Sequence, residues 1–188
     1  MQKLRNYFQN IGFSGDDLDQ ILAAFTFEIC RKNDLVVEEG KVSRQIGFVE
    51  SGMFQYFVLM DGEERTTYIN IENTFMASLL SFVSEAPALE NVRALTDGSS
   101  ISLITKTNLK KLVSEIPRFK NFYINLLEHA LCGIDESRHD LIVMTGEQRY
   151  EKMLRKEPHL LQQIPLQYLA SMLGVTPRHL SRIRNNIR

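Results

Sequence analysis

The sequence contains no tryptophan, only two cysteines and no apolar run of the length that a membrane span requires. A spanning helix needs about 20 consecutive apolar residues, and the N-terminal segment MQKLRNYFQN lacks the apolar centre of a signal peptide. We therefore expect a cytoplasmic protein that makes no membrane contact. Cys30 and Cys132 have no metal-binding spacing, and we expect both to be buried free thiols.

The motifs that enzymes use for nucleophilic or metal-assisted chemistry are also missing. The chain has no G-x-S-x-G, no Walker loop and no H-E-x-x-H. Four scattered histidines have no carboxylate at metal-site spacing: His129, His139, His159 and His179. The sequence therefore predicts no enzymatic activity, no metal and no cofactor.

Charge is nearly balanced overall but not along the chain. The formal net charge is −1 over 188 residues, a length that suits one large domain or two modest ones. From Glu147 onward, 8 Lys and Arg stand against 3 Glu, a net +5, which leaves −6 for the rest of the chain. This segregation concentrates positive charge where phosphate binding would need it.

The most specific pattern is LQYLASMLGVTPRHLSRI, residues 166–183. Ala170 is small where two helices must cross, and Gly174 suits the positive φ angle of a tight turn. Thr176 can cap a second helix that starts with Pro177. An ordinary helical hairpin does not need this combination, so the pattern favours a helix-turn-helix that binds DNA. The inward positions are apolar: Leu169, Leu173, Val175, Leu180 and Ile183.

Polar residues that could reach DNA follow the outward face of the second predicted helix. We predict DNA contacts from Thr176, Arg178, His179, Ser181, Arg182 and Arg184. Arg184 and Arg188 are expected to contact phosphates, which carry no sequence information. The alternative is a small-molecule-binding module whose C-terminal helices contact other proteins, but such a face should expose Leu, Phe or Tyr.

Before this region the chain alternates between two kinds of pattern. Residues 1–24 favour two helices, and residues 25–105 contain short β-rich runs separated by turns, as in a small sandwich or barrel. Asp61-Gly62 is the clearest hairpin. Phe75–Ala86 interrupts the strands and predicts a short helix or irregular loop, where either a ligand pocket or plain core packing could form.

A broad apolar stripe follows Pro117 on a predicted long helix. It must fold back on its own domain or pair with a second copy, and we predict a homodimer interface. Thr145 and Gln148 form a capping box for the next helix. The predicted divisions are 1–115 for an effector domain, 116–145 for a dimerisation helix and 146–188 for the DNA-binding domain. The interface candidates are Phe119, Phe122, Tyr123, Leu126, Leu127, Ala130 and Ile134.

Three segments together resemble the Crp/Fnr family of bacterial transcription regulators: IPLQYLASMLGVTPRHLSRI, GEQRYEKML, and IGFVESGMFQYFV with DGEERTTYINIENTF. The last is similar to the I-x-x-G…D-G-x-E strands of cyclic-nucleotide-binding domains. The resemblance implies an α+β fold with an N-terminal β-roll (a double-stranded β-helix or jelly roll), a long dimerisation helix and a C-terminal all-α winged helix-turn-helix. It also implies a homodimer that reads a palindromic operator and responds to a small-molecule effector, which stays unidentified.

The nucleotide pocket of that family is not matched. Its cyclic AMP receptors bind ribose with a Gly-Glu pair and the phosphate with an Arg ten residues beyond that Glu. Aligning Asn91–Ala94 with the end of the family's R-S-A-x-V-x-A run places Ala88 at the Arg position and Ala77-Ser78 at the Gly-Glu pair. On an alternating strand Arg93 would face away, and the charge of Glu90 repels phosphate.

We therefore predict a pocket that does not bind cyclic AMP in the usual way. It accepts an uncharged or differently charged ligand, or it is vestigial. The pocket candidates are Ala77, Ser78, Leu79, Ala88 and Glu90. Iron–sulfur sensing, another use of the family, is not expected because two cysteines cannot supply four ligands.

The resemblance also ranks the DNA-reading residues. Arg182 matches the family's base-reading arginine by position, and Arg178 ranks second because the family often carries there an acid that reads cytosine. The printed sequence ends at Arg188, where family members usually add a β-hairpin wing. We therefore expect fewer backbone contacts and weaker DNA binding.

Overall fold

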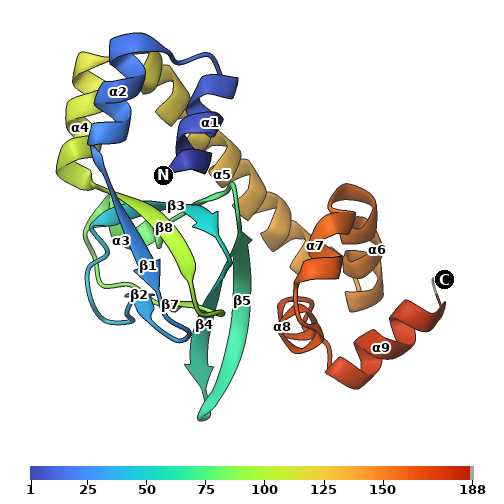
Figure 1. Cartoon of the computed structure of the whole chain (residues 1–188). Coiled ribbons are helices and arrows are strands. Elements are labelled where there is room, and N and C mark those ends of the chain that lie inside the picture. Colours follow the sequence, from blue (N-terminus) through green and yellow to red (C-terminus); the bar gives the residue numbers. More distant parts are fainter. Residues whose placement is uncertain (187–188) are drawn as a thin grey trace. The chain divides into compact units, whose positions relative to one another are not determined.

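The structure, a computed structural model, describes residues 1–186 and has an α+β architecture (Figure 1). Its contacts divide the chain into two compact units, Met1–Val58 with Tyr68–Tyr123, and Leu59–Thr67 with Ile124–Arg188. The first unit holds most of a β-roll and the helices that cover it. The second holds the tip of one roll hairpin and the C-terminal helices.

Within residues 1–186, eight strands form two four-stranded sheets, as the strand-and-turn pattern between residues 25 and 105 predicts. The neighbours β1–β8, β3–β8, β3–β6, β2–β7 and β4–β7 run antiparallel. One sheet has the order β1 (Phe25–Cys30), β8 (Ser99–Thr105), β3 (Gln45–Ser51), β6 (Phe75–Met76). The other has the order β2 (Leu35–Val37), β7 (Asn91–Ala94), β4 (Met53–Met60), β5 (Glu63–Ile71).

The predicted hairpin is present between β4 and β5. Asp61 and Gly62 have φ angles of 54° and 82°, the two positive values that a two-residue type I′ turn requires. Gly adopts such angles freely and Asp tolerates them.

Helices α1 (Gln2–Asn10), α2 (Gly15–Ala23) and α4 (Lys106–Glu115) gather at one end of the roll (Figure 1). Their buried side chains, including Leu4 and Phe8 of α1, share a core with Phe48 of β3 and Ile104 of β8. A second apolar cluster, with Phe54, Tyr56, Val92 and Ala94, lies between the two sheets. The roll therefore has two cores, one inside it and one beneath its helices.

A buried carboxylate fastens α1 to the roll. Glu50 on β3 accepts the backbone N–H of Lys3 at 3.0 Å and the hydroxyl of Ser102 at 2.8 Å. Acceptors at a helix N-terminus are favoured because the first N–H groups of a helix have no partner within it. Hydrogen bonding thus offsets the desolvation of this buried charge.

Helix α5 (Pro117–Val143) is continuous through the polar segment Asp135–Asp140. Its first turns belong to the roll core: Phe119 is 1% exposed, and Phe122 and Tyr123 pack against the same cluster. Their assignment to a dimer interface is wrong for Phe119, because a side chain buried by its own chain offers no surface to a second copy. For Phe122 and Tyr123, most of that surface is likewise taken.

The remaining apolar residues of α5 are more accessible. Leu126, Leu127 and Ala130 are half-buried, whereas Leu131 and Ile134 are 67% and 55% exposed. The first alternative that the sequence left open, folding back on its own domain, therefore holds for only part of the stripe. The start of the stripe folds back, and its end stays open.

Helices α6 (Gly146–Lys156), α7 (Pro158–Gln163), α8 (Leu166–Met172) and α9 (Pro177–Asn186) complete the second unit. The predicted capping box starts α6: the Thr145 hydroxyl accepts the Gln148 N–H at 3.3 Å, and the Gln148 side chain accepts the Thr145 N–H at 2.8 Å. Helix α7 is not anticipated by the sequence patterns. It begins at Pro158 and buries Leu160 and Leu161.

The two cysteines lie in different environments. Cys30 is buried at the end of β1, as expected, but Cys132 is exposed on α5. The expectation of two buried thiols is wrong for Cys132, whose side chain is left exposed on α5 by the described chain. In residues 1–186 no helix has both the length and the apolar character that crossing a lipid bilayer demands.

Candidate functional site

The candidate site lies on the helix pair α8–α9 and the turn between them. Gly174 has a φ of 64°, the left-handed conformation that the sequence predicts. Its N–H donates to Ser171 O at 3.0 Å, and Val175 N–H donates to Ala170 O at 3.0 Å. Ala170 is fully buried. The turn therefore closes α8 in the way that a left-handed glycine cap does.

Helix α9 starts with the predicted cap. The Thr176 hydroxyl accepts the backbone N–H of His179 at 3.2 Å, and Pro177 is the first helical residue. Leu180 and Ile183 point into the unit and are buried. The cap and the apolar face fix which side of α9 remains accessible.

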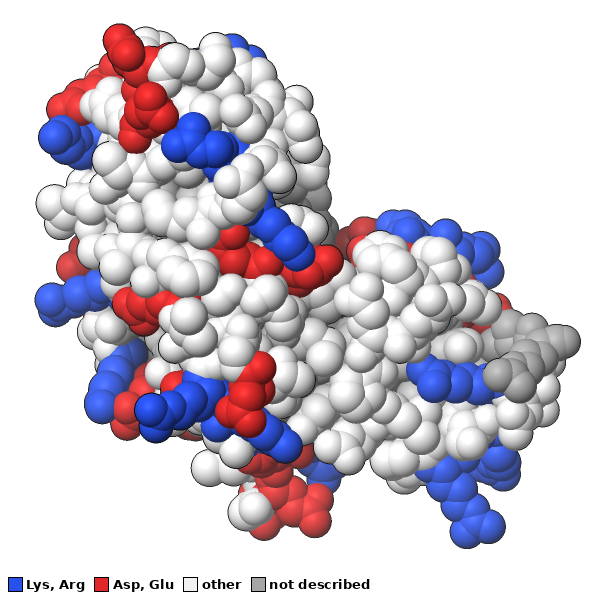
Figure 2. Space-filling model, viewed as in Figure 1, with Lys and Arg blue, Asp and Glu red and all other residues white. Residues whose placement is uncertain are grey.

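That accessible side is polar and basic. Arg178, Ser181 and Arg182 are exposed, and His179 is half-buried. Arg182 Nη2 donates to His179 Nδ1 at 3.1 Å. Figure 2 shows Lys and Arg atoms without neighbouring acidic atoms at the lower edge of this helical region. The structure thus gathers Arg178, Ser181 and Arg182 on one open surface.

Arg184 does not belong to this surface. It is half-buried, its Nη2 donates to Leu161 O at 3.0 Å, and its guanidinium lies over the Tyr150 ring. The side chain thus ties α9 to α7 and α6, and its expected contact with DNA phosphate stays a prediction. Arg188, the other expected phosphate contact, lies outside the described residues.

Arg149 is a second internal arginine, which sequence reasoning counted only as part of the positive tail. Its guanidinium donates to Met144 O and Leu173 O, both at 2.6 Å. A Cβ placed on Gly146 would lie 2.3 Å from Val175 Cγ1. Together these contacts hold the start of α6 against the α8–α9 turn. The sequence signal that could have indicated this role was the position of Arg149, one turn after the cap of a helix that precedes the helix-turn-helix pattern.

The predicted ligand pocket maps to the roll interior and to α3 (Leu79–Ser84), which confirms a helix in the interrupting segment. Ser78 and Ala88 are buried, at 3% and 2% exposure, and Ala88 belongs to the cluster between the sheets. The Tyr56 hydroxyl donates to Ala77 O at 3.3 Å. Tyr56, which was not among the predicted pocket residues, therefore contacts Ala77 and shares an apolar cluster with Ala88.

The environment of Tyr56 disfavours negative charge. Burial raises the pKa of its phenol, and the nearby charge of Glu90 raises it further. Glu90, half-buried, directly precedes β7, and the Tyr68 ring packs edge-on at 6.0 Å from Tyr56. Burial and the charge of Glu90 therefore both work against a further negative charge beside Tyr56, such as that of a phosphate.

Arg93 faces away from this interior, as strand alternation predicts. Its neighbours Val92 and Ala94 point between the sheets, whereas Arg93 donates to Gln55 Oε1 at 3.0 Å and lies 4.5 Å from the Phe57 ring centre. Ser81, which sequence reasoning missed, fixes α3 instead. Its hydroxyl accepts the Ser43 N–H at 2.9 Å and donates to Ala86 O at 2.6 Å.

Residues 28–115 match the family model of the cyclic nucleotide-binding domain. These residues form a domain like that one. No curated protein sequence matches the chain.

Solved structures share the fold at low sequence identity. FixK2 from Bradyrhizobium japonicum is 15% identical, with a TM-score of 0.73 over 87% of this chain and 84% of that one. The c-di-GMP responsive global regulator CLP from Xanthomonas campestris is 17% identical, with 0.67 over 91% and 90%. The Thermus thermophilus catabolite activator protein is 19% identical, with 0.59 over 94% and 84%. These comparisons extend the shared fold beyond the cyclic nucleotide-binding-like domain into the C-terminal helices.

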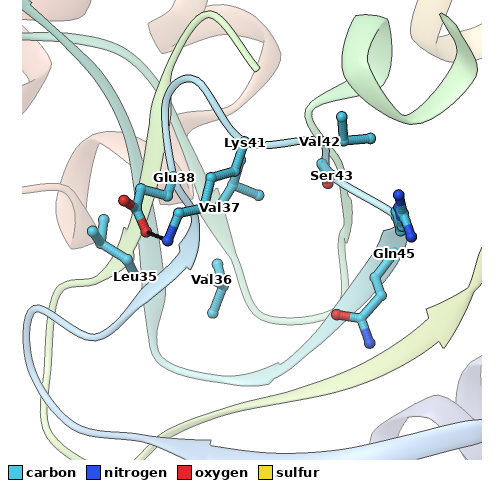
Figure 3. Close-up of a pocket in the computed structure, with 9 residues that line it drawn as sticks. Leu35, Val36, Val37, Glu38, Lys41, Val42, Ser43 and Gln45 are labelled. Atoms are coloured by element: carbon cyan, nitrogen blue, oxygen red, sulfur yellow. Dashed lines mark ion pairs between the residues drawn. The ribbon is translucent and has the colours of Figure 1, made fainter. Parts of the chain in front are cut away.

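A cavity of about 300 Å³ opens at a different place in this domain, beside β2 and the loop that leads to β3 (Figure 3). Lys41 pairs with Glu38 at 2.6 Å at its edge. None of the predicted pocket residues lines it. Its lining consists of Leu35, Val36, Val37, Glu38, Lys41, Val42, Ser43, Arg44 and Gln45. In the part of the chain that the structure covers, no three His, Cys, Asp or Glu residues are placed to hold a metal ion.

Proposed function

We propose that the chain is a dimeric transcription regulator that binds specific DNA through the α8–α9 helix-turn-helix. The proposal rests on the exposed basic face of α9. The cap at the start of α9 and its buried apolar residues fix the orientation of this face. An N-terminal first turn with such residues can enter the major groove, where arginine can bind guanine O6 and N7 together. The fold shared with the c-di-GMP responsive global regulator CLP supports it.

Arg182 is assigned to base reading and Arg178 to a second base contact, because both side chains are exposed on the first turns of α9. His179 and Ser181 lie between them and can contact bases or phosphates. Thr176 already caps α9 with its hydroxyl, so its contribution to DNA binding is the helix N-terminus that it positions. The domain divisions at residues 1–115, 116–145 and 146–188 belong to this proposal.

Selection from a random double-stranded DNA pool tests DNA binding directly. We expect enrichment of two-fold symmetric sites and an affinity that falls steeply with salt. Arg178→Ala with Arg182→Ala should abolish the enrichment, whereas Arg155→Ala, on the exposed side of α6, should not. Binding to all sequences alike, with no enriched site, would count against sequence-specific recognition.

The dimer is proposed to form through the open end of the α5 stripe. Leu131 and Ile134 are exposed there and Leu127 is half-buried, and burying apolar surface yields about 25 cal/mol per Å². Leu131→Glu should dissociate the dimer in sedimentation experiments. Cys132→Glu is the control and should not, because the next residue of a helix points away from the paired face. A wild-type protein that stays monomeric at micromolar concentration would contradict this interface.

The roll is proposed to sense a ligand other than cyclic AMP. Ala77, Leu79 and Ala88 offer no charged group to a ligand, and Glu90 brings the wrong charge for a phosphate. We expect cyclic AMP and cyclic GMP to bind no tighter than about 1 mM in calorimetry. Micromolar affinity for either nucleotide would overturn this part of the proposal without affecting DNA binding.

A further inference from the structure

The exposed face of α5 has a heptad pattern of apolar residues in which one position is occupied by a charged side chain. Ile124, Leu127, Leu131 and Ile134 follow one another at spacings of three, four and three residues. The next position of the pattern, four residues on, is Arg138. Leu141, 57% exposed, comes three residues after it. This spacing keeps all six side chains on one face of a helix that pairs with another.

The pattern identifies the occupant of this face as a second copy of the same helix. Apolar residues at alternating spacings of three and four are self-complementary, because each side chain packs between residues of an identical partner. In a parallel pair related by two-fold symmetry, a residue at a core position meets its own copy. Arg138 would therefore face another Arg138.

The ion pair that Arg138 makes within its own helix does not remove this conflict. Its Nη2 lies 2.9 Å from Asp135 Oδ1, one turn back, and both side chains are about 70% exposed. Such exposed pairs are weak and are screened by salt. Two guanidinium groups that meet across a helix pair would still repel each other.

We propose that Arg138 ends the close pairing of the two α5 helices and holds their last turns, residues 138–143, apart. This inference rests on the proposed self-pairing of α5. Residues 124–134 hold the dimer together, and the Arg138 layer sets how far the pairing extends.

The same turns of α5 are tied on their other side to α6. Lys152 Nζ lies 2.8 Å from Glu136 Oε1 and 2.5 Å from Asp140 Oδ2, and Lys156 Nζ also pairs with Glu136. Helix residues two positions apart in sequence are separated by about 200° around the helix axis. Glu136 and Asp140 each lie two positions from Arg138, so they point away from the face that carries it. Any movement of these turns is thus passed to α6.

Helix α6 in turn holds the α8–α9 turn through Arg149 and Gly146. The separation of the last turns of α5 therefore sets how the two helix pairs of a dimer are presented. Arg138 is a positioning residue, because it touches neither DNA nor ligand.

Arg138→Leu tests the proposal, with His139→Leu as the matched control that adds the same side chain one residue off the paired face. By sedimentation, Arg138→Leu should tighten the dimer about tenfold, and His139→Leu should not. Raising the salt concentration should strengthen the wild-type dimer, because screening weakens the repulsion, and should leave the Arg138→Leu dimer unchanged.

Distances between spin labels locate the effect. A label on Cys132, which is exposed while Cys30 is buried, reports on the closely paired segment. A label on Val143→Cys, in a Cys132→Ser background, reports on the last turns. Arg138→Leu should leave the Cys132 distance unchanged, and should shorten and narrow the distance at position 143.

Two negative results have different meanings. If the wild type is a dimer, and Arg138→Leu changes neither its affinity nor the label distance at position 143, only the role of Arg138 is overturned. Monomers for both proteins at every concentration would overturn the self-pairing of α5, and with it this inference. Arg138→Gln, which removes the charge but keeps a polar side chain, should lose the salt dependence and serves if Arg138→Leu does not fold.

Discussion

The roll and the C-terminal helical unit are stabilised in different ways. The core under the roll helices contains many contacting aromatic rings, such as Phe8 with Phe13 at 5.5 Å and with Phe119 at 6.1 Å. The helical unit buries aliphatic side chains and a single aromatic one among its described residues, Tyr150, and it is fastened by Arg149 and Arg184, which donate to backbone carbonyls. The roll is thus held by many shared contacts and the helical unit by a few specific ones.

The largest effect should come from a change in the roll core. Phe8→Ala should lower the free energy of unfolding by about 3–5 kcal/mol, because it leaves a cavity among rings that cannot collapse. Phe27→Ala, on the half-exposed side of β1, should cost much less. Denaturant titration measures both, and equal losses would mean that the roll core is not the stabilising element.

In the helical unit, Arg149→Met should cost about 2–3 kcal/mol of unfolding free energy, because two carbonyls lose a charged donor. Arg155→Met on the exposed side of the same helix is the control and should be nearly neutral. Amide hydrogen exchange should show the loss in α6, α8 and α9 and leave the roll protected. An effect spread evenly over the chain would argue that the two units are not independent.

Two of the arginines of α9, Arg182 and Arg184, should respond to substitution in opposite ways. Arg182→Ala should cost about 1–3 kcal/mol of binding free energy on the preferred DNA and blur one base position per half-site, while the unfolding free energy stays unchanged. Arg184→Ala should instead cost about 1 kcal/mol of unfolding free energy and keep the base preference. If the two substitutions exchange these outcomes, the assignment of reader and internal tie is reversed.

The smallest expected effect is the loss of the stability that Glu136 contributes as the pH falls. Hydrogen bonds from Lys152 and Lys156 lower the pKa of Glu136 from 4.5 to about 2. A depressed pKa adds stability that is present above pH 4.5 and is lost as the pH falls towards 2. The stability difference between wild type and Glu136→Gln should therefore shrink over that interval. A difference that stays constant from pH 6 to pH 2 would show that the lysines do not stabilise the ionised carboxylate.

Features set by neighbouring residues could be predicted from the sequence. The Thr145 capping box, the Asp61-Gly62 turn, the left-handed Gly174 and the Thr176 cap all depend on backbone geometry over four residues or fewer. Helix α7 could not be predicted from the sequence, because a six-residue helix has too few turns to show a hydrophobic period. The basic face of α9 was predicted for the same local reason, since the cap and the apolar spacing fix which side chains point outward.

Only the tertiary structure decided which partner each outward or inward side chain finds. Arg184 looks like a DNA contact until Leu161, 23 residues earlier, lies within reach of its guanidinium. Phe119 looks like an interface residue until Phe8 and Phe13 pack against it, and Cys132 looks buried although the described chain leaves it exposed. A sequence period fixes the direction of a side chain on its own helix, whereas burial depends on segments that only folding brings alongside.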